Sequence, residues 1–225
     1  AAATGKPKGR ITDGRWVVHD LIHVDERRRL VYFTAAGREP GRNPYYRHLY
    51  RTSLDGGEPE LLTAEDADHE ITMAPSGAYF VDTCSRVDLP PISLLRKADG
   101  SLVLTLEVAD IARLLVTGWR IPERFQVKAR DGVTDLYGVI LRPSDYDPSR
   151  RYPVLEGIYT GPQWLRAPRA FGGGERWEEF WQDQALAELG FVVVLMDGLG
   201  MSYRDKPFED FSYQNLGDAG LADHV

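Results

Sequence analysis

One tyrosine stands where its side chain could take part in acyl-transfer chemistry. Tyr159 ends a predicted strand at 154–159 and precedes a turn at Gly161-Pro162. A side chain at the end of a buried strand can face a site, and a phenol O–H aimed at a developing oxyanion stabilises it by about 3 kcal/mol. A strand-end aromatic that only packs against its neighbours is the alternative. Position alone does not separate these two interpretations.

Two histidines imitate a zinc motif but stand in the wrong kind of element. In His19-Asp20-Leu21-Ile22-His23 the spacing is that of H-E-x-x-H, with Asp in place of Glu. Residues four apart are neighbours on a helix, whereas on a strand they lie about 13 Å apart. Because the surrounding sequence is β-like, we expect no metal site at His19 and His23.

Two further residues resemble parts of a catalytic triad. Gly200-Met201-Ser202-Tyr203-Arg204 begins like the nucleophile motif G-x-S-x-G, but Arg204 replaces the last glycine, which permits close helix–strand contact behind the serine. We therefore do not assign Ser202 as a nucleophile. His224 comes before any expected nucleophile, whereas the triad residues of α/β-hydrolases follow the order Ser, Asp, His along the chain. A surface histidine on a helix is the expectation for it.

Composition excludes several classes of protein. The net charge of −7 and the pI of about 5.3 argue against nucleic-acid binding, since such domains carry a basic face. No apolar run approaches the roughly 20 residues that span a bilayer. Cys84 is the only cysteine, so an internal disulfide is impossible. The chain starts at Ala1 without Met or a signal-like apolar core, and we expect any targeting segment to be absent from this chain.

The first half of the sequence predicts short strands separated by turns. The pattern of residues 22–33 recurs at 71–81, and that of residues 48–56 recurs at 93–100. The offset of roughly 45 residues is within the range of a four-stranded propeller blade. Two blades cannot close a ring, so we expect the last one to two blades of a β-propeller.

The second half has a different texture. A short helix is predicted at 106–115 and a domain boundary at 117–123, followed by a hairpin. The best helix runs from Arg176 to Leu189, and the apolar run 191–196 after it predicts a strand covered on both faces, as in a parallel sheet. Strand, helix and strand make a βαβ unit. We expect residues 192–195 to lack a neighbouring strand, and the isolated chain to self-associate.

Several segments together carry a family resemblance. Tyr152-Pro153-Val154, Ile158-Tyr159-Thr160-Gly161-Pro162 and Asp197-Gly198-Leu199-Gly200 resemble the prolyl oligopeptidase family of serine peptidases, and within it the branch that contains dipeptidyl peptidase IV. Further matching segments are 61–63, 73–77, 131–138, 142–148 and, as in bacterial members, 215–220.

The resemblance implies a mixed fold. Residues 1–121 would form the C-terminal blades of a β-propeller, and residues 122–225 the N-terminal part of an α/β-hydrolase domain, truncated before the nucleophile. It also implies that Tyr159 donates its hydroxyl to the oxyanion. No residue here matches the family's Ser, Asp and His triad, or the acidic pair that holds a substrate's amino terminus in dipeptidyl peptidases.

The implied function is that of a serine-type peptidase in the full-length protein. It would cleave short peptides through an acyl-serine intermediate, with dipeptidyl and post-proline specificity as options, whereas this chain alone is expected to be inactive. We expect a peptide substrate and no binding of nucleic acid, cofactor or metal. The expected location is periplasmic or secreted, and a homodimeric parent protein is an open option. Two alternatives stay open: a non-catalytic propeller module that binds a protein or glycan, and another α/β-hydrolase such as an acyl-aminoacyl peptidase or esterase.

Overall fold

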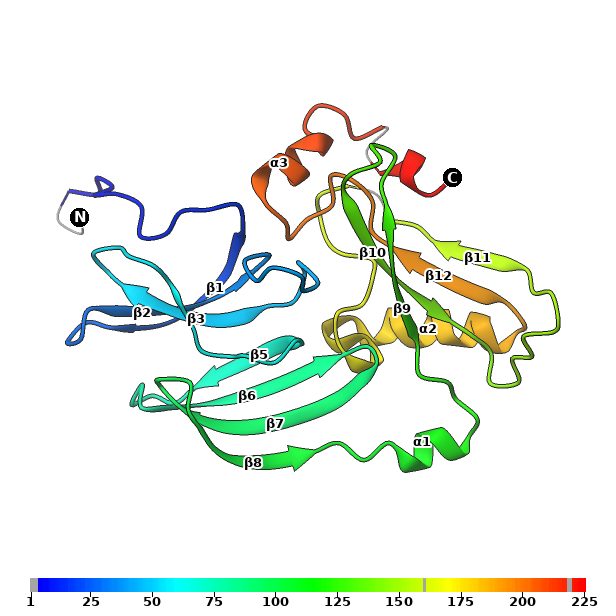
Figure 1. Cartoon of the computed structure of the whole chain (residues 1–225), viewed down its shortest axis with the longest axis horizontal. Helices are drawn as coiled ribbons and strands as arrows, with labels where there is room; N and C mark the ends of the chain where they lie inside the picture. Colours follow the sequence, from blue (N-terminus) through cyan, green and yellow to red (C-terminus); the bar gives the residue numbers. More distant parts are fainter. Residues whose placement is uncertain (1–3, 160, 218–219) are drawn as a thin grey trace.

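Twelve strands form three four-stranded sheets in this computed structural model, which describes residues 4–159, 161–217 and 220–225 (Figure 1). Thr160, Asp218 and Ala219, which belong to motifs quoted above, lie outside the described residues. In the described part of the chain, no helix combines the length and apolar character needed to cross a bilayer.

The first sheet is an antiparallel meander. Its strands are β1 (Val17–Asp25), β2 (Leu30–Ala36), β3 (His48–Ser53) and β4 (Glu60–Leu61), in that order. Successive side chains of a strand point to opposite faces, and β2 buries both. Val31 and Phe33 pack with Tyr50 on one face, while Tyr32 packs with Leu49 on the other.

The second sheet repeats the meander. Its strands are β5 (Asp68–Met73), β6 (Tyr79–Arg86), β7 (Leu89–Lys97) and β8 (Leu102–Val108). Phe80 of this sheet shares a buried cluster with Tyr32, Leu49 and Leu62, so the two sheets are packed together. The predicted repeat of four-stranded units is confirmed, and the strand order is that of propeller blades. The described residues form no closed ring of such sheets.

The helix predicted at 106–115 is wrong over its first half. Residues 106–108 belong to β8, which pairs with β7 through Leu104 opposite Leu95 and Val108 opposite Ile92. Only Ala112–Val116 forms a helix, α1. Apolar residues at 102, 104 and 106 have the two-residue period of a strand, and pairing with β7 decides the conformation.

The third sheet combines segments that are distant in the sequence. Its order is β11 (Val154–Gly157), β12 (Val192–Met196), β10 (Asp135–Leu141), β9 (Glu123–Lys128). The predicted hairpin is confirmed as β9 and β10. The expectation that residues 192–195 lack a neighbour is wrong, because β12 pairs in parallel with β11 and antiparallel with β10. The sheet is therefore mixed rather than parallel.

Helix α2 (Trp177–Glu188) confirms the best predicted helix, and it covers one face of this third sheet (Figure 1). Phe180 and Ala187 pack against Val193 and Leu195 of β12. Phe180, Asp183, Gln184 and Ala187 are the buried residues of α2, whereas Trp177 and Leu189 are exposed. The Asp183 carboxylate accepts hydrogen bonds from Arg166, and Gln184 Nε2 donates to the carbonyl of Arg142, whereas Gln184 Oε1 is buried without a partner in the described residues.

Short helical turns complete the chain. They are the 3-10 turns Phe171–Arg176, Asp210–Ser212 and Leu221–Asp223, and the helix α3 (Lys206–Glu209). The side chain of Asp205 caps α3 by accepting a hydrogen bond from the backbone N–H of Phe208 at 3.3 Å. Such a cap satisfies one of the donors left free at a helix start.

Candidate functional site

Tyr159 lies just beyond the carboxyl end of β11. Because β11 and β12 are parallel, the segments after both strands meet at one edge of the third sheet. The half-buried Tyr159 ring packs against the cluster that contains Met196, Leu199 and Phe208. Its ring also stacks on Trp164, with centroids 4.3 Å apart and planes at 22°. Within the described residues, no hydrogen bond to the Tyr159 hydroxyl is formed.

Asp197 ends the neighbouring strand β12 and fixes the loop that follows Tyr159. Its buried carboxylate accepts hydrogen bonds from the backbone N–H groups of Arg166 at 2.5 Å and Ala167 at 3.3 Å. Burial raises the pKa of the Asp197 carboxyl to about 7, more than these N–H groups lower it. The family motif contains Asp197, but nothing in the sequence pattern indicated that it would tie down this loop.

The same loop is attached to helix α2 by two arginines. Arg166 donates to both carboxylate oxygens of Asp183 at 2.8 Å. The Arg176 guanidinium lies 4.3 Å from the centroid of the Trp164 ring and pairs with Glu179 in the first turn of α2. Trp164 is thus held between Tyr159 and a charged group that is itself anchored to the helix.

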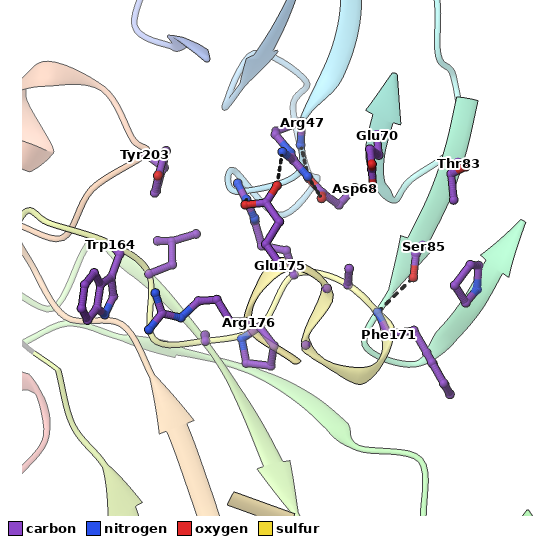
Figure 2. A pocket seen from close by; sticks show the side chains of 18 residues that line it. Arg47, Asp68, Glu70, Thr83, Ser85, Trp164, Phe171, Glu175, Arg176 and Tyr203 are labelled. Carbon is purple, nitrogen blue, oxygen red and sulfur yellow. Dashed lines mark hydrogen bonds and ion pairs between the residues drawn. The ribbon is translucent and has the colours of Figure 1, made fainter. Parts of the chain in front are cut away.

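A cavity of about 200 Å³ separates this loop from the second sheet (Figure 2). Arg47, directly before β3, spans it by pairing with Asp68 of β5 and with Glu175 of the loop, both at 2.8 Å. The Ser85 hydroxyl of β6 accepts a hydrogen bond from the backbone N–H of Phe171 at 2.9 Å. Other lining residues include Glu70, Thr83, Trp164, Arg169, Arg176 and Tyr203.

The two sequence-predicted histidines contact different partners. His19 and His23 lie on β1, as expected, and their rings stack or tilt against Tyr203 at 4.7 Å and Tyr32 at 5.9 Å respectively. Burial, reinforced by the positive charge of Arg169, lowers the pKa of His19 to about 4. His19 is therefore neutral at physiological pH, and its ring acts as an aromatic surface beneath Tyr203.

Ser202 and His224 are not joined to Tyr159 by any hydrogen bond in the described part of the chain. The Ser202 hydroxyl is buried and lacks a partner there. The expectation that His224 is a surface residue on a helix is wrong. Its side chain is 1% exposed, follows a 3-10 turn, and places Nδ1 2.5 Å from Glu156 of β11.

The burial of His224 follows from the residue before it. The Asp223 carboxylate accepts hydrogen bonds from the backbone N–H groups of Arg130 and Leu199, both at 2.9 Å. These contacts hold the turn against the third sheet, so His224 faces β11 rather than solvent. Neither bond could be foreseen from residue types, because each partner is distant in the sequence.

A cluster in the second sheet has the composition of a metal site. Glu65, His69 and Asp82 place ligand-type atoms within 4.8 Å of one another. Arg96, however, donates to Asp82 at 2.9 Å and to Glu65 at 2.5 Å, while His69 Nδ1 lies 2.7 Å from Asp82. The guanidinium already provides the positive charge that these carboxylates need. The cluster is therefore an ion-pair network, which is buried at His69 and Asp82 and exposed at Glu65.

Comparisons with known proteins agree with one another. Residues 1–91 match a family model described as the dipeptidyl peptidase IV N-terminal region. The chain is 31% identical over 228 residues to human dipeptidyl peptidase 8. This alignment covers 96% of the chain and 24% of that protein. It is 30% identical over 223 residues to a probable dipeptidyl-aminopeptidase B of Emericella nidulans, with 96% and 23% covered.

Two solved structures are similar over nearly the whole chain. A putative dipeptidyl aminopeptidase IV from Bacteroides ovatus matches with a TM-score of 0.76 and 25% identity, over 96% of this chain and 29% of that one. Porphyromonas gingivalis dipeptidyl peptidase 4 matches with a TM-score of 0.71 and 27% identity, over 94% and 28%. The chain spans about a quarter of the length of the curated relatives. Over nearly its whole length, the chain is thus similar to proteins of the dipeptidyl peptidase IV family.

Proposed function

We propose that the whole protein is a serine-type peptidase that hydrolyses short peptides, and that Tyr159 helps to stabilise the oxyanion. The observation that carries this proposal is the position of Tyr159 directly beyond the carboxyl end of β11, with a hydroxyl that has no hydrogen-bond partner among the described residues. Ligands of sheets with parallel strands bind at the carboxyl ends of those strands. A phenol there can donate its proton to a charge that develops only during the reaction.

The domain boundaries are part of the same proposal. Residues 1–121 would be the C-terminal blades of a β-propeller, supported by two consecutive four-stranded meanders. Residues 122–225 would be the N-terminal part of an α/β-hydrolase domain, supported by the parallel pair of β11 and β12 with α2 between them in sequence. The connection runs from the end of β8 at Val108 to the start of β9 at Glu123.

The proposed reaction requires a nucleophilic serine and a histidine base, and no residue of this sequence is assigned to either role. In the proposed reaction a serine Oγ attacks the peptide carbonyl carbon while a histidine takes the serine proton. The carbonyl oxygen then carries negative charge, which the Tyr159 O–H and a backbone N–H would stabilise. The C–N bond breaks as the histidine returns the proton to the departing amine, and water hydrolyses the acyl-serine. We expect the 225-residue chain alone to lack activity, since it has no G-x-S-x-G sequence.

The relatives suggest the substrate class. Proteins named as dipeptidyl peptidases match nearly the whole chain, which supports the release of dipeptides from a peptide substrate. A post-proline preference is an option within this proposal, and the Xaa-Pro substrate used below tests it. The cavity beside Trp164 is open to both the second sheet and the loop after Tyr159, so a peptide passing this edge would contact both halves of the chain.

The test is a single hydroxyl deletion in the full-length protein. Tyr159→Phe should lower kcat on a chromogenic Xaa-Pro-p-nitroanilide by about 100-fold to 1000-fold with little change in KM, as for loss of one oxyanion donor. Tyr79→Phe is the matched control, because Tyr79 is 44% exposed on β6 of the second sheet and does not line the cavity. Unchanged kcat/KM in Tyr159→Phe would remove Tyr159 from the mechanism, and absence of hydrolysis by the wild type would favour a binding module.

A further inference from the structure

We propose that Trp164 is a positioning residue that sets the orientation of the Tyr159 phenol; this rests on the function proposed above. Tyr159 lies on an irregular segment beyond β11, and no hydrogen bond within the described residues fixes its hydroxyl. The closest ring contact of its side chain is the stack on Trp164 at 4.3 Å. The angle at which the phenol presents its O–H therefore depends on where the indole lies.

The indole is in turn held by a chain of contacts that ends in regular structure. Arg176 places its guanidinium 4.3 Å from the Trp164 ring centroid, and Figure 2 shows the two side chains next to each other at the edge of the cavity. A cation over an aromatic ring is attracted by the negative face of the ring. Arg176 Nε donates to Glu179 at 3.0 Å, and Glu179 belongs to the first turn of α2.

The backbone beside Trp164 has a second anchor. Two residues further on, the Arg166 N–H donates to Asp197 at the end of β12, and the Arg166 side chain donates to Asp183 of α2. Trp164 is therefore connected to α2 through Arg176 and to both α2 and β12 through Arg166. Such connections let a strand and a helix, rather than a loop, determine the position of a functional group.

Position matters because an oxyanion donor acts only over a narrow range. The donor must reach about 2.7–3.1 Å from the oxygen that becomes charged. A displacement of about 1 Å in a reacting group can lower the rate by about 100-fold. If the Tyr159 ring loses its stacking partner, its hydroxyl can still donate a hydrogen bond, but the position of that hydroxyl is no longer fixed. Loss of Trp164 should therefore act on kcat through Tyr159.

A competing role for Trp164 is direct contact with substrate, because its side chain also lines the cavity. The two roles differ in their kinetics. A substrate contact made equally in the ground and transition states changes KM, whereas a positioning role changes kcat. They differ also in additivity, since two residues that act through the same hydroxyl are strongly coupled.

The experiment is a double-mutant cycle in the full-length protein, with an Xaa-Pro-p-nitroanilide as substrate. Trp164→Ala should lower kcat about 10-fold to 100-fold with little change in KM, and Trp164→Phe should restore most of the loss because it keeps a ring for stacking. In a Tyr159→Phe background, Trp164→Ala should have little further effect. Trp177→Ala is the matched control, since this tryptophan of α2 is 58% exposed.

Each outcome has one meaning. If Tyr159→Phe does not change kcat, the proposed function fails and the positioning role fails with it. If Tyr159→Phe lowers kcat but Trp164→Ala has no effect, lowers it additively or acts on KM, only the positioning role is overturned. Should Trp164→Ala fold poorly, as measured by circular dichroism, the same cycle with Trp164→Phe and Trp164→Leu decides through kcat and its coupling to Tyr159.

Discussion

Two buried aspartates, one in each half of the molecule, have carboxyl pKa values shifted in opposite directions. Asp68 is 4% exposed in the second sheet, and Asp197 is fully buried at the end of β12. Burial raises the pKa of the Asp68 carboxyl, but Arg169 and Arg47 together outweigh it and hold the pKa below its usual range. Asp197 has backbone N–H donors as its closest partners, and burial raises its pKa to about 7.

The difference shows what kind of partner each half uses. Guanidinium groups compensate the buried carboxylates of the second sheet, where Arg47 binds Asp68 and Arg96 binds Asp82. At the carboxyl edge of the third sheet, peptide dipoles bind Asp197 and leave the charge largely uncompensated. Perturbed carboxyls of this second kind are concentrated at functional sites. The blade-like sheets are therefore stabilised by ion pairs, whereas the loop at the candidate site is held by a carboxyl that can gain a proton near neutral pH.

The largest effect should come from removing the guanidinium of the first region. Arg47→Ala leaves the Asp68 carboxylate buried without its closest cation, and breaking such a pair costs about 3–5 kcal/mol. Urea unfolding followed by tryptophan fluorescence measures the loss. Arg28→Ala is the matched control, because Arg28 is 69% exposed in its pair with Asp25 and should change stability little. Equal effects of the two variants would contradict the role assigned to Arg47.

The next effect is expected at the second aspartate, Asp197, and it depends on pH. The folded-state pKa of Asp197 is raised from 3.8 to about 7, so its contribution to stability is complete below pH 4 and is lost as the pH rises through 7. Between about pH 4 and pH 8 the wild type should therefore lose about 4 kcal/mol relative to Asp197→Asn. Parallel pH profiles of the two proteins in urea unfolding would contradict this.

Asp68→Asn should give the reverse profile with a smaller amplitude. A pKa held below 3.8 means that the carboxylate contributes stability above about pH 4 and loses it as the pH falls further. The wild type should exceed the Asn variant by about 2 kcal/mol at pH 7, as for hydrogen bonds to a charged group. This advantage should shrink below pH 4. An advantage that grows on acidification would show that Asp68 is not stabilised as a carboxylate.

The smallest change in stability is expected on the outer strand. Leu102, Leu104 and Leu106 of β8 are each about half exposed on an edge strand. Leu104→Lys should change the free energy of unfolding by less than about 0.5 kcal/mol. Because charged residues on edges oppose strand-to-strand association, it should reduce self-association of the 225-residue chain in analytical ultracentrifugation. Tyr79→Lys on β6 is the comparison variant away from this edge.

The parts of the fold that depend on nearby residues were predictable. The repeat from β2 and β3 to β6 and β7 is visible as a pattern, because each strand pairs with the next one along the chain. Helix α2 and the hairpin of β9 and β10 are local for the same reason. The misplaced helix at 106–115 arose where helical and strand spacing both fit the apolar residues, and pairing with β7 was decisive.

The candidate site was predictable only at Tyr159, which a strand end and a turn identify. Trp164, Asp197 and Arg176 were missed because their roles depend on contacts between the loop, β12 and α2, which no local pattern encodes. His224 was misjudged for the same reason, since Asp223 fixes its turn through donors far away in the sequence. The neighbours of β12 were missed because the hairpin strand β10 returns to pair with it.

Arg47 has one consequence for how the two halves can separate. Its partner Asp68 is 4% exposed, whereas its other partner Glu175 is 67% exposed and close to solvent. Water competes for Glu175 but not for Asp68, so thermal motion that widens the cavity breaks the contact with Glu175 first. The guanidinium then stays paired with Asp68 of the second sheet and no longer contacts Glu175, so part of its positive charge faces the cavity. Widening the cavity thus changes its electrostatic character as well as its size.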